Sequence, residues 1–191
     1  MINISTYKYE LLDNTLIYPL SLIRGIGTLT AKNIVKEREE NGLFSSYLDF
    51  VRRCYKLGRD VVRNLILSGA LDTFGMTRKT LIENLENAIN YAELCSDLDE
   101  SLVLKPEIKE YDEYNRDELT KHEIALYGFY ISNHPTSKYL TDKSITTNIV
   151  EKYFDRFVEM VLYIERKKEI DTKTNEKMMF LNSSDSYGEI E

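Results

Sequence analysis

The stretch that decides the fold is LIRGIGTLTAKNIVKEREENG, residues Leu22 to Gly42. It holds three of the chain's eight glycines, and two of them, Gly25 and Gly27, have one isoleucine between them. A short apolar run precedes this pair, and a helix-like run over 29–41 follows it. Gly42 stands where a left-handed glycine would end that helix. The stretch therefore predicts two helices joined by a tight glycine turn.

Helix, glycine turn and helix in this order predict a helix-hairpin-helix element, whose turn can bind a phosphate. Glycine permits positive φ and lets another backbone approach closely, while the amides at the start of the second helix attract an anion. We expect Gly25, Ile26, Gly27 and Thr28 to form this site, with Ile26 filling the space between the helices. Lys32, one turn further on, would add a phosphate contact that reads no bases. The alternative is a plain turn between helices, in which the glycines serve geometry alone.

A second glycine turn lies in LILSGALDTFGMTRKTL, residues 65–81. Thr77 is predicted to cap a long helix through residue 98. Arg78 and Lys79 fall at the start of that helix, where cations oppose the helix dipole. Their placement favours a role outside the helix, and paired hairpins can hold both strands of a duplex.

The remaining pattern predicts a mainly α-helical chain with strands at both ends. Asp13-Asn14 is typical of a tight hairpin between two short strands within 7–20. Residues 99–121 read as an acidic linker, and a helix follows that is predicted to end at His134-Pro135. From residue 157 two alternating strands flank a turn over 172–177, and a third strand begins near the end. The predicted regions are 1–20, a hairpin; 21–98, the tandem helix-hairpin-helix domain; 99–152, the linker and helix; and 153–191, the strands.

Composition limits the classes of protein to consider. The formal charge is −7, and residues 93–120 hold ten Asp and Glu against three Lys and Arg. No apolar run approaches the roughly 20 residues that span a bilayer, and no signal peptide is recognisable. We therefore expect a cytoplasmic protein without a membrane partner. Cys54 and Cys95 form no metal-binding motif, so both are predicted to be buried thiols and no metal site is expected.

Four stretches together resemble the C-terminal part of the bacterial DNA polymerase III alpha subunit, the C-family of replicative polymerases. They are LSLIRGIGTLTAKNIVKEREENGLFSSYLDFVRR, LILSGALDTFGMTRKTL, ALYGFYISNHPTSKY and IDTKTNEKMMFLNSSDSYGEIE, in the order that the family has them. The last two are the more specific. Tyr127 departs from the family, which usually has Leu before Gly-Phe-Tyr.

The resemblance implies a tandem helix-hairpin-helix domain that holds double-stranded product DNA, followed by the start of an OB fold. Carried over to this chain, it implies contacts to the two strands of the duplex: one strand by Gly25, Ile26, Gly27 and Thr28, the other by Gly75, Thr77, Arg78 and Lys79. An OB fold has five strands, so we expect this part to be truncated. The family's OB fold handles single-stranded template, for which Tyr163, Arg166, Lys167, Lys168 and Phe180 are candidates. Tyr163 and Phe180 could instead belong to a barrel core.

The resemblance also implies a sliding-clamp peptide, here within SDLDESLVLKPE, residues 96–107. The usual motif begins with Gln, and this chain contains none. The nearest fit starts at Asp99 and uses Leu102 and Val103 as apolar anchors. The alternative is a solvated acidic linker.

No catalytic residue and no cofactor are predicted in this chain. Asp97 and Asp99 mimic a two-metal site, but they fall where a helix gives way to an acidic linker rather than on a rigid strand. The parent that the chain resembles would be a DNA-directed DNA polymerase that uses Mg²⁺, with its catalytic acids elsewhere in the polymerase. Two alternatives stay open: a stand-alone helix-hairpin-helix adaptor or repair module, and a protein-interaction module.

Overall fold

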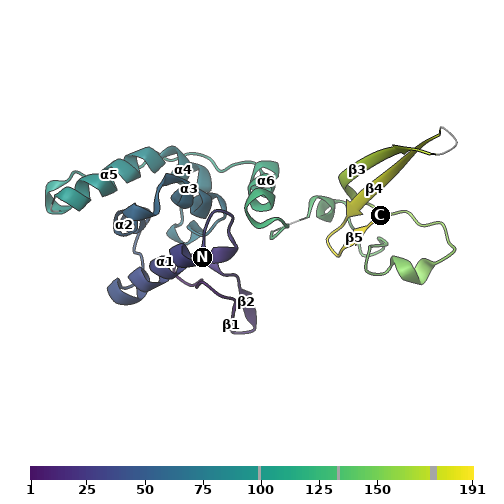
Figure 1. Ribbon diagram of the computed structural model, residues 1–191, viewed down its shortest axis with the longest axis horizontal. Coiled ribbons are helices and arrows are strands. Elements are labelled where there is room, and N and C mark those ends of the chain that lie inside the picture. Colours follow the sequence, from purple (N-terminus) through teal and green to yellow (C-terminus); the bar gives the residue numbers. More distant parts are fainter. Residues whose placement is uncertain (99, 133, 173–175) are drawn as a thin grey trace. The chain divides into compact units, whose positions relative to one another are not determined.

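The computed structural model describes residues 1–98, 100–132, 134–172 and 176–191, apart from the side chains of Asp97 and Glu100. The chain divides into two compact units, Met1–Phe129 and Tyr130–Glu191, whose elements are labelled in Figure 1. The predicted range 99–152 is thereby split between the two units. Its first part packs with the helices and its last part with the C-terminal sheet.

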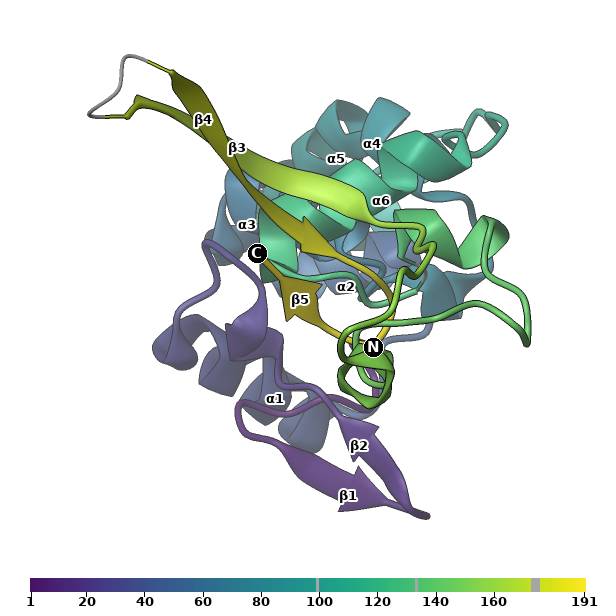
Figure 2. The ribbon, with the colours of Figure 1, turned by 90° about the vertical axis from the view of Figure 1, so that its right-hand side faces the viewer.

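The first unit opens with a two-stranded antiparallel hairpin. Strand β1 (Glu10–Leu12) pairs with β2 (Thr15–Ile17), and Leu11 lies opposite Leu16. Asp13 and Asn14 both have positive φ, of 46° and 61°, as a type I′ turn requires. The hairpin lies beside the first long helix (Figure 2). The predicted N-terminal hairpin is confirmed.

The first glycine turn lies between a 3-10 helix, Leu20–Leu22, and helix α1 (Thr28–Asn41). Gly42 ends α1 with a φ of 81°, a backbone conformation that favours glycine. Helix α2 (Tyr47–Arg53) begins at Ser46, whose hydroxyl accepts the Asp49 N–H at 3.2 Å. This bond satisfies one of the amides left open at a helix start.

The second turn connects shorter helices. Helix α3 (Arg59–Leu67) leads through a 3-10 turn, Asp72–Phe74, to helix α4 (Arg78–Glu83), and α5 (Leu85–Asp97) follows. The prediction of one long helix over 77–98 is wrong, because the helix breaks at Asn84. The Asn84 side-chain amide donates to the carbonyls of Thr80 and Lys109 at 2.7 and 2.8 Å. Asparagine interrupts helices by such competing backbone bonds.

The core of the first unit comes from all of these helices. Its most deeply buried members include Leu20, Ala31, Ile34, Phe50, Leu65, Leu71, Leu81 and Ala88. Cys54 is buried as expected, and burial raises the pKa of its thiol to about 12. Cys95 is only half-buried, because it falls in the last turn of α5.

Helix α6 (Arg116–Tyr127) completes the first unit. A capping box of Asn115 and Glu118 starts it, and Gly128, with a φ of 80°, ends it. The prediction that this helix runs to His134 is wrong, because the left-handed glycine stops it earlier. Pro135 instead starts a 3-10 helix, Pro135–Lys138, where its fixed φ is well tolerated.

The second unit holds a three-stranded antiparallel sheet in the order β3-β4-β5. Strand β3 (Tyr163–Asp171) pairs with β4 (Lys177–Ser184), which pairs with β5 (Glu189–Ile190). These strands match the three that were predicted, while residues 173–175 of the predicted turn lie outside the described residues. Every residue of β3 is exposed, Tyr163 among them. Completion of this sheet into a five-stranded barrel stays a prediction.

Candidate nucleic-acid interface

The two glycines of the first turn differ in their need for glycine. Gly25 has a φ of +83°, and a Cβ there would lie 2.8 Å from Nδ2 of Asn64. Gly27 has an ordinary φ of −71°, and nothing lies within 4 Å of the place of its Cβ. The backbone therefore requires glycine at 25 but not at 27. Because Gly27 has no side chain, the space next to its backbone at the protein surface stays open.

The amides that follow Gly25 are the chemically useful groups of this turn. Ile26 donates its N–H to the Ile23 carbonyl at 3.0 Å. For the amides of Gly27 and Thr28 we find no acceptor in the described part of the chain, and no side chain caps α1. Both residues are exposed. Open amides at the start of a 14-residue helix form a site that suits an anion.

Two other predicted residues flank these amides. Ile26 is 3% exposed and belongs to the core, as its predicted role between the helices requires. Lys32 is exposed on α1, one turn after Thr28, and its Nζ lies 5.1 Å from the centroid of the Tyr7 ring. A weak cation–π contact of this kind leaves the ammonium accessible to a phosphate.

The second turn has a similar backbone, but its amides have an acceptor within the chain. Gly75 is left-handed, with a φ of 72°, and Thr77 caps α4 by accepting the Thr80 N–H at 3.0 Å. The first two amides of α4, from Arg78 and Lys79, donate to the carboxylate of Glu113 at 2.8 and 3.2 Å. A side chain of the protein itself thus fills the place where an external anion would bind.

Glu113 is held there by an extended segment, residues 109–114, which packs on α4. The Thr77 hydroxyl donates to the Tyr111 carbonyl at 2.8 Å, and the Thr80 hydroxyl accepts the Tyr111 N–H at 2.8 Å. Asn84 accepts the Lys109 N–H at 3.1 Å and returns a bond to the Lys109 carbonyl. This part of the predicted acidic linker is therefore a packed element of the first unit.

The Arg78 side chain points into the fold. Its Nη2 lies 2.8 Å from Oδ2 of Asp72, its Nη1 donates to the Leu67 carbonyl at 3.3 Å, and only 15% of the side chain is exposed. Burial alone would lower the pKa of Arg78, but the hydrogen bonds and charge of Asp72 raise it. The geometry thus holds Arg78 against Asp72 and the Leu67 carbonyl, and its contact to a duplex stays a prediction.

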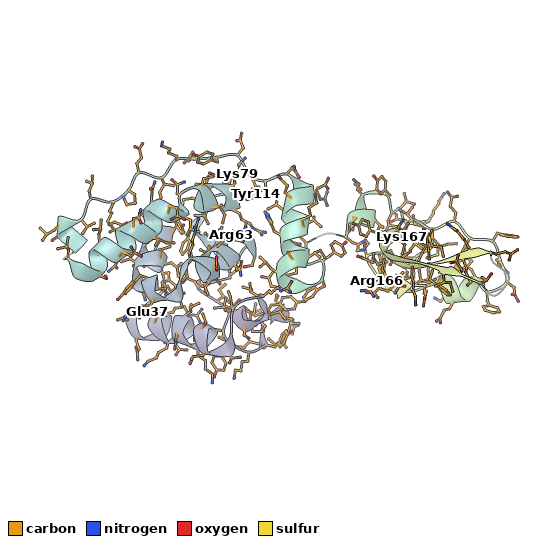
Figure 3. The ribbon with its side chains drawn as sticks, turned by 45° about the horizontal axis from the view of Figure 1, so that its top comes forward. Glu37, Arg63, Lys79, Tyr114, Arg166 and Lys167 are labelled. Carbon is orange, nitrogen blue, oxygen red and sulfur yellow. The ribbon has the colours of Figure 1, made fainter. Side chains whose placement is uncertain are left out.

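Lys79 lies at the edge of the same region, with its Nζ 5.9 Å from the centroid of the Tyr114 ring. Figure 3 labels both residues together with Arg63, an exposed cation of α3. Burial raises the pKa of Tyr114 and lowers the pKa of His122, and the charge of Arg63 acts to lower both pKa values. Sequence reasoning missed Arg63 because one arginine within a helix gives no signal of what it will face.

The predicted clamp peptide is placed only in part. A 3-10 helix covers Glu100–Leu102, Leu102 is 76% exposed and Val103 is half-buried. Asp99, the predicted start of the motif, lies outside the described residues. The side chain of Asp97 is not described either, so the structure does not place the rejected Asp97/Asp99 metal pair. An exposed leucine is compatible with a binding anchor, and the clamp contact stays a prediction.

Two further kinds of site would bind a metal ion or a membrane. Among the residues that the structure describes, no cluster of three His, Cys, Asp or Glu is arranged to hold a metal ion. Within the same residues, no helix has the length and apolar character that crossing a bilayer requires.

The first turn joins two helices tightly and has open amides at the second helix, as expected of a helix-hairpin-helix element. A family model described as a helix-hairpin-helix motif matches residues 1–81 of the chain. That range includes the first turn and reaches through the start of α4.

The relatives that match along nearly the whole chain are DNA polymerase subunits. DNA polymerase III subunit alpha of Bacillus subtilis is 32% identical across the whole chain, and that of Staphylococcus epidermidis is 31% identical across 96% of it. The Staphylococcus aureus subunit is 29% identical across 96%. Over nearly its whole length the chain is similar to part of the DNA polymerase III alpha subunit, and it spans 18% of the length of these relatives.

Proposed function

We propose that this chain binds double-stranded DNA without sequence preference, as a non-catalytic part of a replicative DNA polymerase. One observation supports it above the others: the amides of Gly27 and Thr28 are open at the start of α1, beside a glycine that the backbone does not require. A phosphate oxygen accepts such amides, and it needs the room that a missing Cβ leaves. Contacts to phosphate alone hold DNA without reading its sequence.

The first turn is the principal contact in this proposal. Its amides and the ammonium of Lys32 would hold about two phosphates, so affinity should fall about tenfold between about 50 and 200 mM salt. If the second turn also bound two phosphates, as the sequence alone predicts, the fall would be about 100-fold. Glu113 favours the smaller value, because it satisfies the amides of Arg78 and Lys79.

A pair of glycine substitutions tests the proposal. Gly27→Val keeps an allowed extended backbone and adds a side chain in the open space at the amides. It should weaken duplex binding about tenfold, the effect of losing about one hydrogen bond to a charged group, with little change in melting temperature. The matched control is Gly75→Asn, because asparagine tolerates the left-handed backbone found there.

Gly75→Asn should bind as the unsubstituted chain does. Equal binding by Gly27→Val and the unsubstituted chain would contradict the proposed site. Absence of any salt-dependent duplex binding by the unsubstituted chain would instead favour the protein-interaction alternative.

Charge gives an independent test. Lys32→Ala should reduce the slope of log affinity against log salt by about 0.9, the value for one phosphate contact. Lys36→Ala is the control, because Lys36 lies one turn further along α1 and pairs with Glu40 at 3.6 Å. An equal change in slope for the two variants would show a general charge effect rather than a built site.

The role in the parent polymerase extends this proposal. The relatives are named DNA polymerase III subunit alpha, so the parent in this proposal is a DNA-directed DNA polymerase. It would act in the cytoplasm, with catalytic Mg²⁺ held outside this chain. The first unit would hold the product duplex during continued synthesis. Leu102 and Val103 would contact a sliding clamp, and the sheet of the second unit would belong to an OB fold for single-stranded template.

A further inference from the structure

We propose that Asn64, together with the C-terminal end of α6, positions the phosphate-binding turn, so that Asn64 is a positioning residue for DNA binding. The inference rests on the proposed function of the first turn. It concerns two consecutive peptide groups, Ile23–Arg24 and Arg24–Gly25. Neither α3 nor α6 contains the turn, yet each contributes one hydrogen bond that sets its direction.

The first bond comes from α3. Nδ2 of Asn64 donates to the Arg24 carbonyl at 3.0 Å, across 40 positions of sequence. The same nitrogen lies where a side chain of residue 25 would collide with it. Asn64 is half-buried, so it occupies the space beneath the turn. Glycine at 25 is therefore required for its φ of +83°, and a Cβ there would also displace the Asn64 amide from its place.

The second bond comes from α6. The Arg24 N–H donates to the Leu126 carbonyl at 2.8 Å. Leu126 lies one residue before the end of α6, and carbonyls of a last helical turn have no partner within the helix. Arg24 thus uses an acceptor that the helix leaves over, at the end where the helix dipole is negative.

A further bond holds α6 against α3. The Tyr127 hydroxyl donates to the Ser68 carbonyl at 3.1 Å, just beyond the end of α3. Leu126 is buried and belongs to the same core as Ile26. The two elements that hold Arg24 are therefore tied to each other as well as to the turn.

The consequence for binding follows from the order of bonds along the chain. The Arg24 N–H is held by α6, its carbonyl is held by Asn64, and the Ile26 N–H is held by Ile23. The next two amides, of Gly27 and Thr28, are then directed outward by a backbone that has little freedom to rotate. A turn ordered before it binds loses less conformational entropy on binding. Without the Asn64 bond, we expect duplex affinity to fall about tenfold.

Two substitutions separate positioning from packing. Asn64→Leu keeps the volume of the side chain but removes the donor, and Asn64→Ala removes both. Asn90→Ala is the control, because Asn90 is an exposed asparagine on another helix, α5. Duplex affinity over a salt series, melting temperature and the amide NMR signals of residues 25–28 are measured for each variant.

We expect Asn64→Leu and Asn64→Ala to bind duplex about tenfold more weakly, while Asn90→Ala binds normally. The amide signals of Gly25, Gly27 and Thr28 should broaden or shift in both Asn64 variants at temperatures where the fold is intact. Normal binding by Asn64→Leu, or unchanged amide signals, would overturn the inference. If the unsubstituted chain fails to bind duplex, the proposed function fails, and the amide signals still decide whether Asn64 orders the turn.

Discussion

The two glycine turns of the first unit have similar backbones, but they differ in whether the amides at the following helix start have an acceptor. At the first turn, no acceptor in the described part of the chain reaches the amides of Gly27 and Thr28. At the second turn, the carboxylate of Glu113 accepts the amides of Arg78 and Lys79. The difference teaches that a turn of the right shape is not by itself a binding site, because a distant segment of the same chain can satisfy it.

The largest expected effect tests the geometry of the first turn. Gly25→Val forces a β-branched residue to a φ of +83° and into Nδ2 of Asn64. We expect a loss of about 3 kcal/mol in the free energy of unfolding, together with loss of duplex binding. Urea denaturation measures the first quantity and a duplex titration the second. A stable Gly25→Val variant would show that the turn tolerates another backbone.

The next effect concerns the side chain that the second turn keeps inside. Arg78→Ala removes the ion pair with Asp72 and the bond to the Leu67 carbonyl. We expect a loss of about 1–2 kcal/mol in stability, with the salt dependence of duplex binding unchanged. Lys79→Ala is the control and should cost about 0.5 kcal/mol. A reduced salt slope for Arg78→Ala, at unchanged stability, would place Arg78 on the DNA after all.

A smaller effect tests Glu113, the acceptor of the amides at the second turn. Glu113→Gln keeps an acceptor near the Arg78 amide but removes a negative charge from the start of α4. We expect a loss of about 0.5 kcal/mol in stability, because that charge complements the helix dipole. Duplex affinity should rise a few-fold as repulsion of phosphate is relieved. Asp112→Asn, an exposed neighbour in the same segment, is the charge control, and an equal rise for both would remove any special role of Glu113.

The smallest effect is a pH dependence at the second turn. The His122 ring lies 5.0 Å from that of Tyr114, and its Nδ1 is buried without a hydrogen-bond partner among the described residues. Burial first, and then the charge of Arg63, lower the pKa of His122 below its ordinary value of 6.5. The unfolded chain therefore takes up the proton first. The contribution to stability is complete above about pH 6.5 and is lost as pH falls toward the folded-state pKa.

Melting temperatures at pH 7.5 and 5.5 measure this dependence, with His122→Phe as the variant that should lose it. His134 lies in the second unit, and burial lowers its pKa too, so His134→Phe is the control. A pH dependence that survives in His122→Phe while the first unit is monitored would contradict the assignment.

Much of the fold could be predicted because its signals are local. Asp13-Asn14, Gly25 and Gly42 take positive φ where the sequence places turns and a helix end, and such preferences depend on a residue and its neighbours. Two helix boundaries were wrong for identifiable reasons. Asn84 breaks a helix through a bond to Lys109, 25 positions away. Gly128 ended α6 before Pro135 could.

The candidate site was predicted less completely. Ile26 and Lys32 lie where their pattern indicates, one in the core and one exposed. Arg78 seemed available because its position opposes the helix dipole, yet Asp72 and the Leu67 carbonyl hold it inside. Asn64 gave no signal at all, because a polar residue within a helix does not reveal which turn it will meet.

By itself, the sequence determined where the two tight turns fall and which residues start the helices after them, since glycine and threonine impose those conformations locally. Only the tertiary structure decided which turn keeps its amides open. Glu113 lies 35 positions from Arg78, and Asn64 lies 40 positions from Arg24. Hydrogen bonds that distant depend on how the whole helical unit packs, and no spacing along the chain encodes them.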